Sequence, residues 1–392
     1  MKFDLYLSEM AITDLHGGGL TLQRVMGNDL MQIKYFAHLS RFAYDLPAAR
    51  RFGDKDIDLT SVWEGNAVRS IIGRSLAAAI NDQSFIKKKA AEKAARALAG
   101  KFENDELINC LVCPQGLSSI YTLEALKRRH KVKYITWVMD DHVVQYNNGE
   151  WHYPKGVGQV LEKHLREAEH VFVISPAMQE FYHDRFGIGS TVLFSPFDLP
   201  ANNAQPVHAE KQPFKIGYFG AVTAWQLDAL NCVAKALTGT ETQLHIYSGV
   251  EKLPEELCLD NVYLQEWVSP GQVLLTMRNY DVVLLPMSFL EKMRNMSAFN
   301  IATKMSEYLA SGVPILAVGP PHAAMMKYLK GNSAAVVVEE CDENAVRNAF
   351  NLLHYKEGIV EILKNAQNLV RNETGTLPMR KRWAEGINRF IS

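Results

Sequence analysis

Two adjacent carboxylates and an imidazole follow an apolar run in the first half of the chain. Asp140, Asp141 and His142 come directly after the segment YITWV, which is typical of a buried strand. At the carboxyl end of a strand, an imidazole and a carboxylate can act as a general base, hold substrate hydroxyls or stabilise developing positive charge. Paired acids at a strand end also serve as helix N-caps. We favour a catalytic site in which Asp140 and His142 act on the substrate and Asp141 supports them.

A lysine and a glutamate form a second candidate pair in the segment NIATKMSEYLASGVPILAVG. The pattern predicts a helix that ends at Gly312, with Lys304 and Glu307 on one of its faces. An ammonium can meet phosphate oxygens, and a carboxylate can accept both hydroxyls of a ribose. The pair therefore suits a phosphorylated ribose ligand. The spacing fits equally well with a solvent-facing ion pair, which would be worth about a few tenths of a kcal/mol.

Three consecutive glycines stand near the start of the chain. Gly17, Gly18 and Gly19 follow His16 and precede a helix-like segment. Glycines at a helix start let backbone N–H groups approach an anion or a sugar closely, although a flexible turn would have the same sequence. We assign His16 and the three glycines to a substrate-binding loop.

Short apolar runs alternate with helix-length segments along the whole chain. Most of the runs are β-branched and apolar on both faces, which fits parallel strands covered by helices. The alternation predicts an α/β fold of two doubly wound, Rossmann-like domains that face each other across a cleft. The predicted strands are 3–7, 108–113, 134–138, 171–174, 191–194, 214–219, 244–247, 262–265, 282–285, 315–318 and 335–338.

The clearest break in the chain is LPANNAQPVHAEKQP, which has three prolines and almost no large apolar side chain. Such a segment is typical of a linker. We therefore expect an N-terminal domain at 1–199, a linker at 200–213 and a C-terminal domain at 214–375.

The composition of the chain excludes several classes of protein. Its 392 residues include 42 Lys and Arg against 43 Asp and Glu, so the overall charge gives no support to a nucleic-acid partner. No apolar run approaches the roughly 18 residues that span a bilayer, and the first ten residues do not resemble a signal peptide. We expect a cytoplasmic protein. Cys110 and Cys113 lack a matching second pair for zinc and are expected to be buried free thiols.

A lysine-rich stretch interrupts the first domain at residues 68–102, which have Ala-rich helical patterning. Because Phe85 and Ile86 are the only large apolar residues close to the cluster, we favour a solvated helix with lysine stems along its surface. The alternative is a peripheral contact with anionic lipid headgroups at the inner face of a membrane. The basic residues are Lys87, Lys88, Lys89, Lys93, Arg96 and Lys101.

Several motifs in order along the chain resemble nucleotide-sugar glycosyltransferases of the two-domain GT-B fold, especially the large family-4-like group. K-x-x-E-Y-L-A-x-G-x-P-I-L at 304–316 resembles their donor-site helix, and YFGA at 218–221 resembles the first strand and loop of their C-terminal domain. AEHVFVIS at 168–175 and TVLFSPFD at 191–198 resemble two late motifs of their N-terminal domain, with Ser195 in place of the usual Asn. The glycine-rich loop after His16 is similar to theirs as well.

The sequence departs from this family at two points. The family has paired glutamates eight residues apart, and Phe299 stands where the first is expected before Glu307. The usual Arg and Lys of the first C-terminal loop are absent from AVTAWQLDAL, so that phosphate charge has to be met by Arg294 and Lys304.

The resemblance implies an enzyme that moves a sugar from a nucleotide-sugar donor to a hydroxyl of a glycan or lipid-linked acceptor, without a metal or other cofactor. It implies retention of anomeric configuration and, as the setting, synthesis of a bacterial surface polysaccharide. It also implies that a final helix, at 376–392, packs back toward the N-terminal domain. Two alternatives stay open: a nucleotide-sugar 2-epimerase of the same fold, and a non-catalytic glycan-assembly protein.

The resemblance assigns one ligand to each domain. The C-terminal domain would hold the donor through Gly220, Arg294, Lys304 and Glu307. The N-terminal domain would hold the acceptor near the glycine-rich loop and near Asp140 and the two residues after it.

Overall fold

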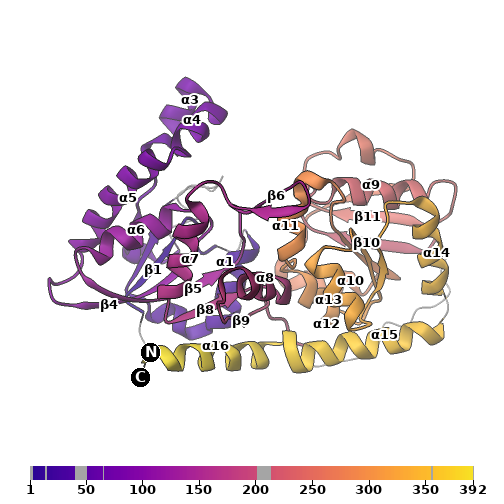
Figure 1. Cartoon of the computed structure of the whole chain (residues 1–392). Helices are drawn as coiled ribbons and strands as arrows, with labels where there is room; N and C mark the ends of the chain where they lie inside the picture. The colour runs from indigo at the N-terminus through magenta and orange to yellow at the C-terminus, as the bar shows by residue number, and fades with distance from the viewer. Residues whose placement is uncertain are drawn as a thin grey trace. The chain divides into compact units, whose positions relative to one another are not determined.

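The structure is a computed structural model that describes residues 3–13, 16–39, 51–64, 66–200, 213–354 and 356–391. The chain divides into two compact units, one of Met1–Ser195 with Arg380–Ser392 and one of Pro196–Met379 (Figure 1). Each unit contains a parallel sheet with helices packed against it. Residues 201–212 of the predicted linker lie outside the described residues.

The first unit contains a seven-stranded parallel sheet in the order β3-β2-β1-β4-β5-β8-β9. The strand order reverses between β1 and β4, and the carboxyl ends of strands next to such a reversal are where doubly wound sheets bind ligands. The side chains of β1 and most of those of β4 and β5 are buried, because helices cover the sheet. The strands are β1 (Leu5–Ser8), β2 (Tyr35–His38), β3 (Asp56–Asp58), β4 (Leu107–Cys113), β5 (Lys131–Val138), β8 (His170–Val173) and β9 (Thr191–Val192).

The helices of this unit begin and end at local signals. In α8, Ser175 accepts a hydrogen bond from the Met178 amide, Pro176 occupies the first turn, and Gly187 ends the helix with a φ of 64°. A short antiparallel hairpin, β6 (Gln145–Asn147) and β7 (Glu150–His152), follows β5. The other helices are α1 (Gly17–Met26), α3 (Asn66–Ile72), α4 (Arg74–Asn81), α5 (Ser84–Ala99), α6 (Ser118–Lys127) and α7 (Val157–Glu167).

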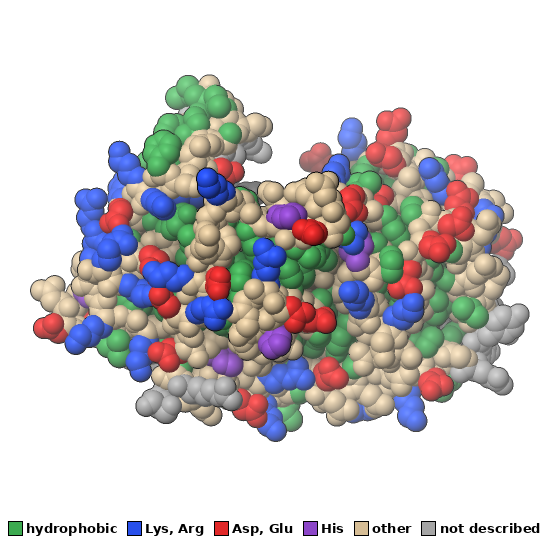
Figure 2. All heavy atoms as spheres, in the orientation of Figure 1, with side chains coloured by type: hydrophobic (Ala, Val, Ile, Leu, Met, Phe, Trp, Pro, Cys, Tyr) green, Lys and Arg blue, Asp and Glu red, His purple; other side chains and the backbone are tan. Residues whose placement is uncertain are grey.

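Helices α3, α4 and α5 form an arm of the first unit (Figure 1). Helices α3 and α4 pack on each other and on η3 (Val62–Glu64), and α5 packs on α6. Hydrophobic side chains gather over the end of the arm (Figure 2).

The second unit contains a six-stranded parallel sheet in the order β12-β11-β10-β13-β14-β15, with its reversal between β10 and β13. The strands are β10 (Lys215–Phe219), β11 (Gln243–Tyr247), β12 (Val262–Gln265), β13 (Val282–Pro286), β14 (Ile315–Val318) and β15 (Val336–Val338). The helices are α9 (Leu227–Ala236), α10 (Pro270–Met277), α11 (Arg294–Phe299), α12 (Met305–Ala310), α13 (Ala324–Gly331), α14 (Glu343–His354) and α15 (Lys356–Leu369).

The last helix, α16 (Thr376–Ile391), belongs to the first unit from Arg380 onward. Its Trp383 ring lies 5.1 Å from Phe172 and 5.8 Å from Trp137, measured between ring centroids. Gly386 permits this approach, because a Cβ atom there would lie 2.3 Å from the Phe172 ring. Aromatic packing therefore holds the end of the chain against the first sheet.

The prediction of an α/β chain with two doubly wound sheets is confirmed, and all eleven predicted strands overlap observed ones. The strands β2, β3, β6 and β7 were missed: all four are only three or four residues long, and β3, β6 and β7 also carry mainly polar or charged side chains. Cys110 and Cys113 are buried free thiols, as predicted. Within the described ranges, no helix is long and apolar enough to cross a membrane.

Candidate functional site

The reversal point of the second sheet brings Lys304 over the end of strand β10. Its ammonium donates hydrogen bonds to the Phe219 carbonyl, at 3.1 Å, and to the Tyr218 hydroxyl, at 3.2 Å. It also lies 4.2 Å from the centroid of the Tyr218 ring, at a distance typical of a cation–π contact. Gly220 follows directly with a φ of 153°, and a Cβ atom there would lie 2.4 Å from the Lys304 Nζ atom. The close approach of lysine to backbone therefore requires glycine at 220.

The hydrogen bonds of Lys304 within the described residues are to a carbonyl and a hydroxyl. No carboxylate in the described part of the chain lies within 4.0 Å of its Nζ atom, so the solvent-facing ion pair, one of two interpretations of the spacing, is wrong. Burial lowers the pKa of Lys304 to about 7, and the charge of Glu307 opposes this fall only in part. Glu307 itself is half-buried, one turn along α12. The result is a desolvated amine without a carboxylate in hydrogen-bonding contact among the described residues.

Helix α12 is fixed to β10 by its own side chains. The Tyr308 hydroxyl accepts a hydrogen bond from the Phe219 amide, at 3.0 Å. Ser311 donates to the Tyr308 carbonyl and accepts from the Val313 amide, and Gly312, with a φ of 77°, ends the helical segment as predicted. The motif at 304–316 therefore contains both Lys304 and the side chains that fix its position over β10.

Arg294 begins α11 and lies within 3.3 Å of Glu291. On the same short helix, the Ser297 hydroxyl lies 3.1 Å from Nε2 of His322, which follows the carboxyl end of β14. Burial, and next the positive charge of Arg294, lower the pKa of His322 to about 4, so this imidazole is neutral at physiological pH. The sequence analysis missed His322, although its position after a predicted strand was the available signal.

In the first unit, Asp141 holds the loop after β5. Its Oδ1 atom accepts from the amides of Val143 and Val144, and its Oδ2 atom accepts from the hydroxyls of Tyr153, at 2.6 Å, and Tyr182, at 3.0 Å. These four hydrogen bonds leave Asp141 little capacity for a substrate. A hairpin, rather than a helix, follows this loop, so the helix N-cap interpretation is wrong.

Asp140 and His142 share a buried neighbour, Gln115, that the sequence analysis missed. His142 Nε2 lies 3.0 Å from the Gln115 carbonyl oxygen and 4.0 Å from Asp140 Oδ2. A carbonyl can only accept, so Nε2 carries the hydrogen and Nδ1 keeps its lone pair. Burial raises the pKa of Asp140 to about 7, against a lowering hydrogen bond from Gln115, and burial lowers the pKa of His142. The backbone N–H of Gln115 donates a hydrogen bond to the Glu9 carboxylate, at 2.9 Å.

The glycine-rich segment forms the first turn of α1, and His16 is its N-cap. His16 Nδ1 accepts from the Gly19 amide, at 3.0 Å, and Nε2 donates to the Ala11 carbonyl, at 2.8 Å. A Cβ atom on Gly19 would lie 2.2 Å from the Thr13 carbonyl oxygen, which gives this glycine a packing role. A Cβ atom on Gly18 would lie 3.2 Å from the Met139 sulfur. The glycine-rich turn and the loop that contains Asp140 and His142 are therefore neighbours at one edge of the sheet.

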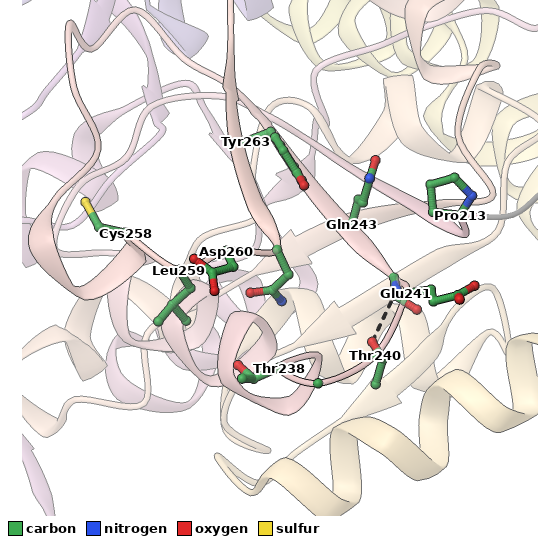
Figure 3. Close-up of a pocket in the computed structure, with 12 residues that line it drawn as sticks. Pro213, Thr238, Thr240, Glu241, Gln243, Cys258, Leu259, Asp260 and Tyr263 are labelled. Carbon is green, nitrogen blue, oxygen red and sulfur yellow. Dashed lines mark hydrogen bonds between the residues drawn. The ribbon is translucent and has the colours of Figure 1, made fainter.

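Two grooves in the second unit lie at opposite ends of its sheet. One, of about 750 Å³, follows the carboxyl ends of β11 and β12 and is lined by Tyr247, Gln265 and Trp267, whose side chain is 62% exposed. The other, of about 740 Å³, lies at the amino ends of the strands, between the segments that include Thr240 and Asp260 (Figure 3). Only the first groove lies on the Lys304 edge.

Comparisons with known proteins bear on the fold. No protein-family model matches the sequence, and no curated protein matches it either. The sucrose-phosphate synthase of Thermosynechococcus elongatus matches 100% of this chain and 99% of its own, at a TM-score of 0.67 and 13% identity. HepE of Anabaena, solved in complex with UDP, matches 99% of this chain and 100% of its own, at 0.64 and 13%. This chain spans only 58% of the length of TarM, which matches 78% of it at a TM-score of 0.54 and 13% identity.

These structures are GT-B glycosyltransferases, and the chain has their fold. The predicted GT-B architecture is therefore confirmed, with parallel sheets of seven and six strands. Identities this low carry the fold alone, so the activity has to be argued from the residues.

Proposed function

We propose that the protein is a glycosyltransferase that moves a sugar from a nucleotide-sugar donor to a hydroxyl acceptor. The observation that carries the proposal is the buried Lys304 ammonium at the reversal point of the second sheet, whose hydrogen bonds in the described part of the chain go to a carbonyl and a hydroxyl rather than to a carboxylate. A bound diphosphate would supply the missing anion and restore the charged form of the amine. The complexes of HepE with UDP and with UDP-glucose support a donor of this class.

The donor would lie along the carboxyl ends of the strands of the second unit. Gly220 leaves the backbone beside Lys304 open to close approach, and Arg294 would provide a second cation for phosphate oxygens. Glu307, one turn from Lys304, would accept hydrogen bonds from ribose hydroxyls. The exposed Trp267 ring offers a surface on which a base can stack.

The acceptor would bind to the first unit. The free Nδ1 lone pair of His142 suits a general base, and a carboxyl with a pKa of about 7, such as Asp140, suits proton transfer near neutral pH. The turn of Gly17 and Gly18 would lie beside the acceptor. The lipopolysaccharide galactosyltransferase WaaB among the matched structures supports a bacterial surface glycan or its lipid-linked precursor as the acceptor. Retention of configuration and a cytoplasmic location are part of the same proposal.

A nucleotide panel tests the donor half. Thermal unfolding is recorded with uridine, guanosine, deoxythymidine, cytidine and adenosine diphosphates, and donor hydrolysis is then measured with the corresponding sugars. Lys304→Met should abolish stabilisation by the preferred nucleotide. Lys330→Met, which removes an exposed lysine that pairs with Glu339 in the same unit, should leave it unchanged. If no nucleotide stabilises the wild type, the proposal is wrong.

Product analysis separates the two alternatives. A 2-epimerase would convert the donor sugar without an acceptor, and a non-catalytic assembly protein would bind nucleotide without turnover. A transferase loses its activity on Asp140→Asn while it keeps its nucleotide affinity, because Asp140 lies in the other unit.

A further inference from the structure

The helical arm of the first unit exposes large apolar side chains at its end. Ile71 on α3 is 81% exposed, Leu76 on α4 is 54% exposed, and Val62 on η3 is 64% exposed. Because η3, α3 and α4 pack on one another, these side chains belong to one small tip. Phe85, at the start of α5, is 68% exposed as well. Exposed apolar side chains that gather in this way mark a surface for interaction.

The same arm is strongly basic, although the whole chain is not. Between residues 66 and 99 there are seven lysines or arginines and two acids, whereas the whole chain has a net charge of −1. Asp82 pairs with Lys87, and Glu92 pairs with Arg128 and Arg129, so neither acid is left to repel an anion. No acid occurs between residues 66 and 81. The basic residues of the arm are Arg69, Arg74, Lys87, Lys88, Lys89, Lys93 and Arg96.

We propose that this arm docks on the surface of an anionic phospholipid bilayer. The tip residues Ile71 and Leu76 would enter the interface, while exposed lysines such as Lys89 and Lys93 would meet headgroup phosphates. A second copy of the chain is a poorer occupant, because pairing two arms would bring together two surfaces on which basic residues outnumber acids.

The structure thereby changes the interpretation of the lysine-rich stretch. From the sequence, only Phe85 and Ile86 accompanied the lysines, and a solvated helix was favoured. The fold adds the tip of α3 and α4, which lies before the lysines in sequence but on the same arm.

Vesicle flotation of the full chain, without any donor, tests the proposal. Vesicles of phosphatidylcholine alone are compared with vesicles that also contain phosphatidylglycerol, at low and high salt. Ile71→Ser combined with Leu76→Ser removes the apolar tip, and Lys89→Gln combined with Lys93→Gln removes two exposed charges. Leu352→Ser is the matched control, because Leu352 is 62% exposed on α14 of the other unit. Circular dichroism and light scattering monitor folding and oligomeric state.

We expect salt-dependent partition into phosphatidylglycerol vesicles only. The tip variant should lower the partition coefficient at least about tenfold, and each removed lysine should lower it roughly fivefold. The control should bind as the wild type does. Absence of partition, or equal partition by the tip variant, would overturn the proposal, as would a dimer that the tip variant dissociates. Because no donor is present, failure of the proposed transferase activity would not affect this result.

Discussion

Replacement of Lys304 by methionine should stabilise the second unit at neutral pH and destabilise it at alkaline pH. A fall of the pKa from 10.5 to about 7 corresponds to roughly 5 kcal/mol of unfavourable desolvation of the ammonium. Methionine removes this desolvation cost, but it also removes two hydrogen bonds, to Phe219 and Tyr218, worth about 1 kcal/mol each. The variant should therefore be more stable than the wild type by about 3 kcal/mol near pH 6.

The sign of the pH dependence follows from proton binding. Between about pH 7 and pH 10 the unfolded chain keeps a proton on this lysine that the folded chain has released, so wild-type stability rises with pH, by at most about 1.4 kcal/mol per pH unit. The variant lacks this contribution, so the difference in the free energy of unfolding between the two proteins should change sign between about pH 7 and pH 10. Urea unfolding at several pH values measures this difference. If both proteins follow parallel curves, or if the variant is less stable throughout, Lys304 is not a desolvated cation.

Nucleotide binding gives an independent measurement of the same group. A diphosphate beside Lys304 should restore its charge, so that binding of the preferred nucleotide at about pH 9 takes up close to one proton. Calorimetry in two buffers of different ionisation enthalpy detects this uptake. Lys304→Met should show none, whereas Lys330→Met should match the wild type.

Three further predictions concern single side chains. Gly220→Ala should lower nucleotide affinity because its Cβ atom displaces the Lys304 ammonium, at a cost of about 1–2 kcal/mol in stability; an unchanged nucleotide titration would contradict this role. Asp140→Asn should abolish transfer. Because the pKa of Asp140 is raised, the wild type loses stability as the pH rises from about 4 to about 7. Urea unfolding near pH 8 should therefore show that the Asn variant is more stable than the wild type. Gln115→Leu removes the hydrogen bond that keeps the proton of His142 on Nε2. It should lower kcat and alter the pH profile of kcat without changing the KM for the donor. An equal loss in donor affinity would argue against a role of Gln115 in positioning His142.

The strands and the edges of the sheets that carry the candidate sites could be predicted from the sequence. Apolar β-branched runs are local signals, and the topology then brings the residues that follow them to the carboxyl edge. The environment of Lys304 could not be predicted, because it depends on Tyr218 and Phe219, which lie 86 and 85 residues away along the chain. Gln115 was missed because an amide in a loop has no distinctive pattern until β4 and β5 are paired.

Asp140 and Lys304 carry opposite charges in different units, yet both pKa values lie at about 7. In each case the largest cause is the same: burial at the carboxyl edge of a strand disfavours the charged form of the group. Both groups therefore lower the stability of the ligand-free protein at neutral pH, which a purely structural role would not require. A bound diphosphate would offset the desolvation of the Lys304 amine. The Asp140 carboxylate would accept the proton that the acceptor hydroxyl loses during transfer. The two perturbed groups thus suit the two halves of one transfer reaction, and removing either should raise stability while it lowers activity.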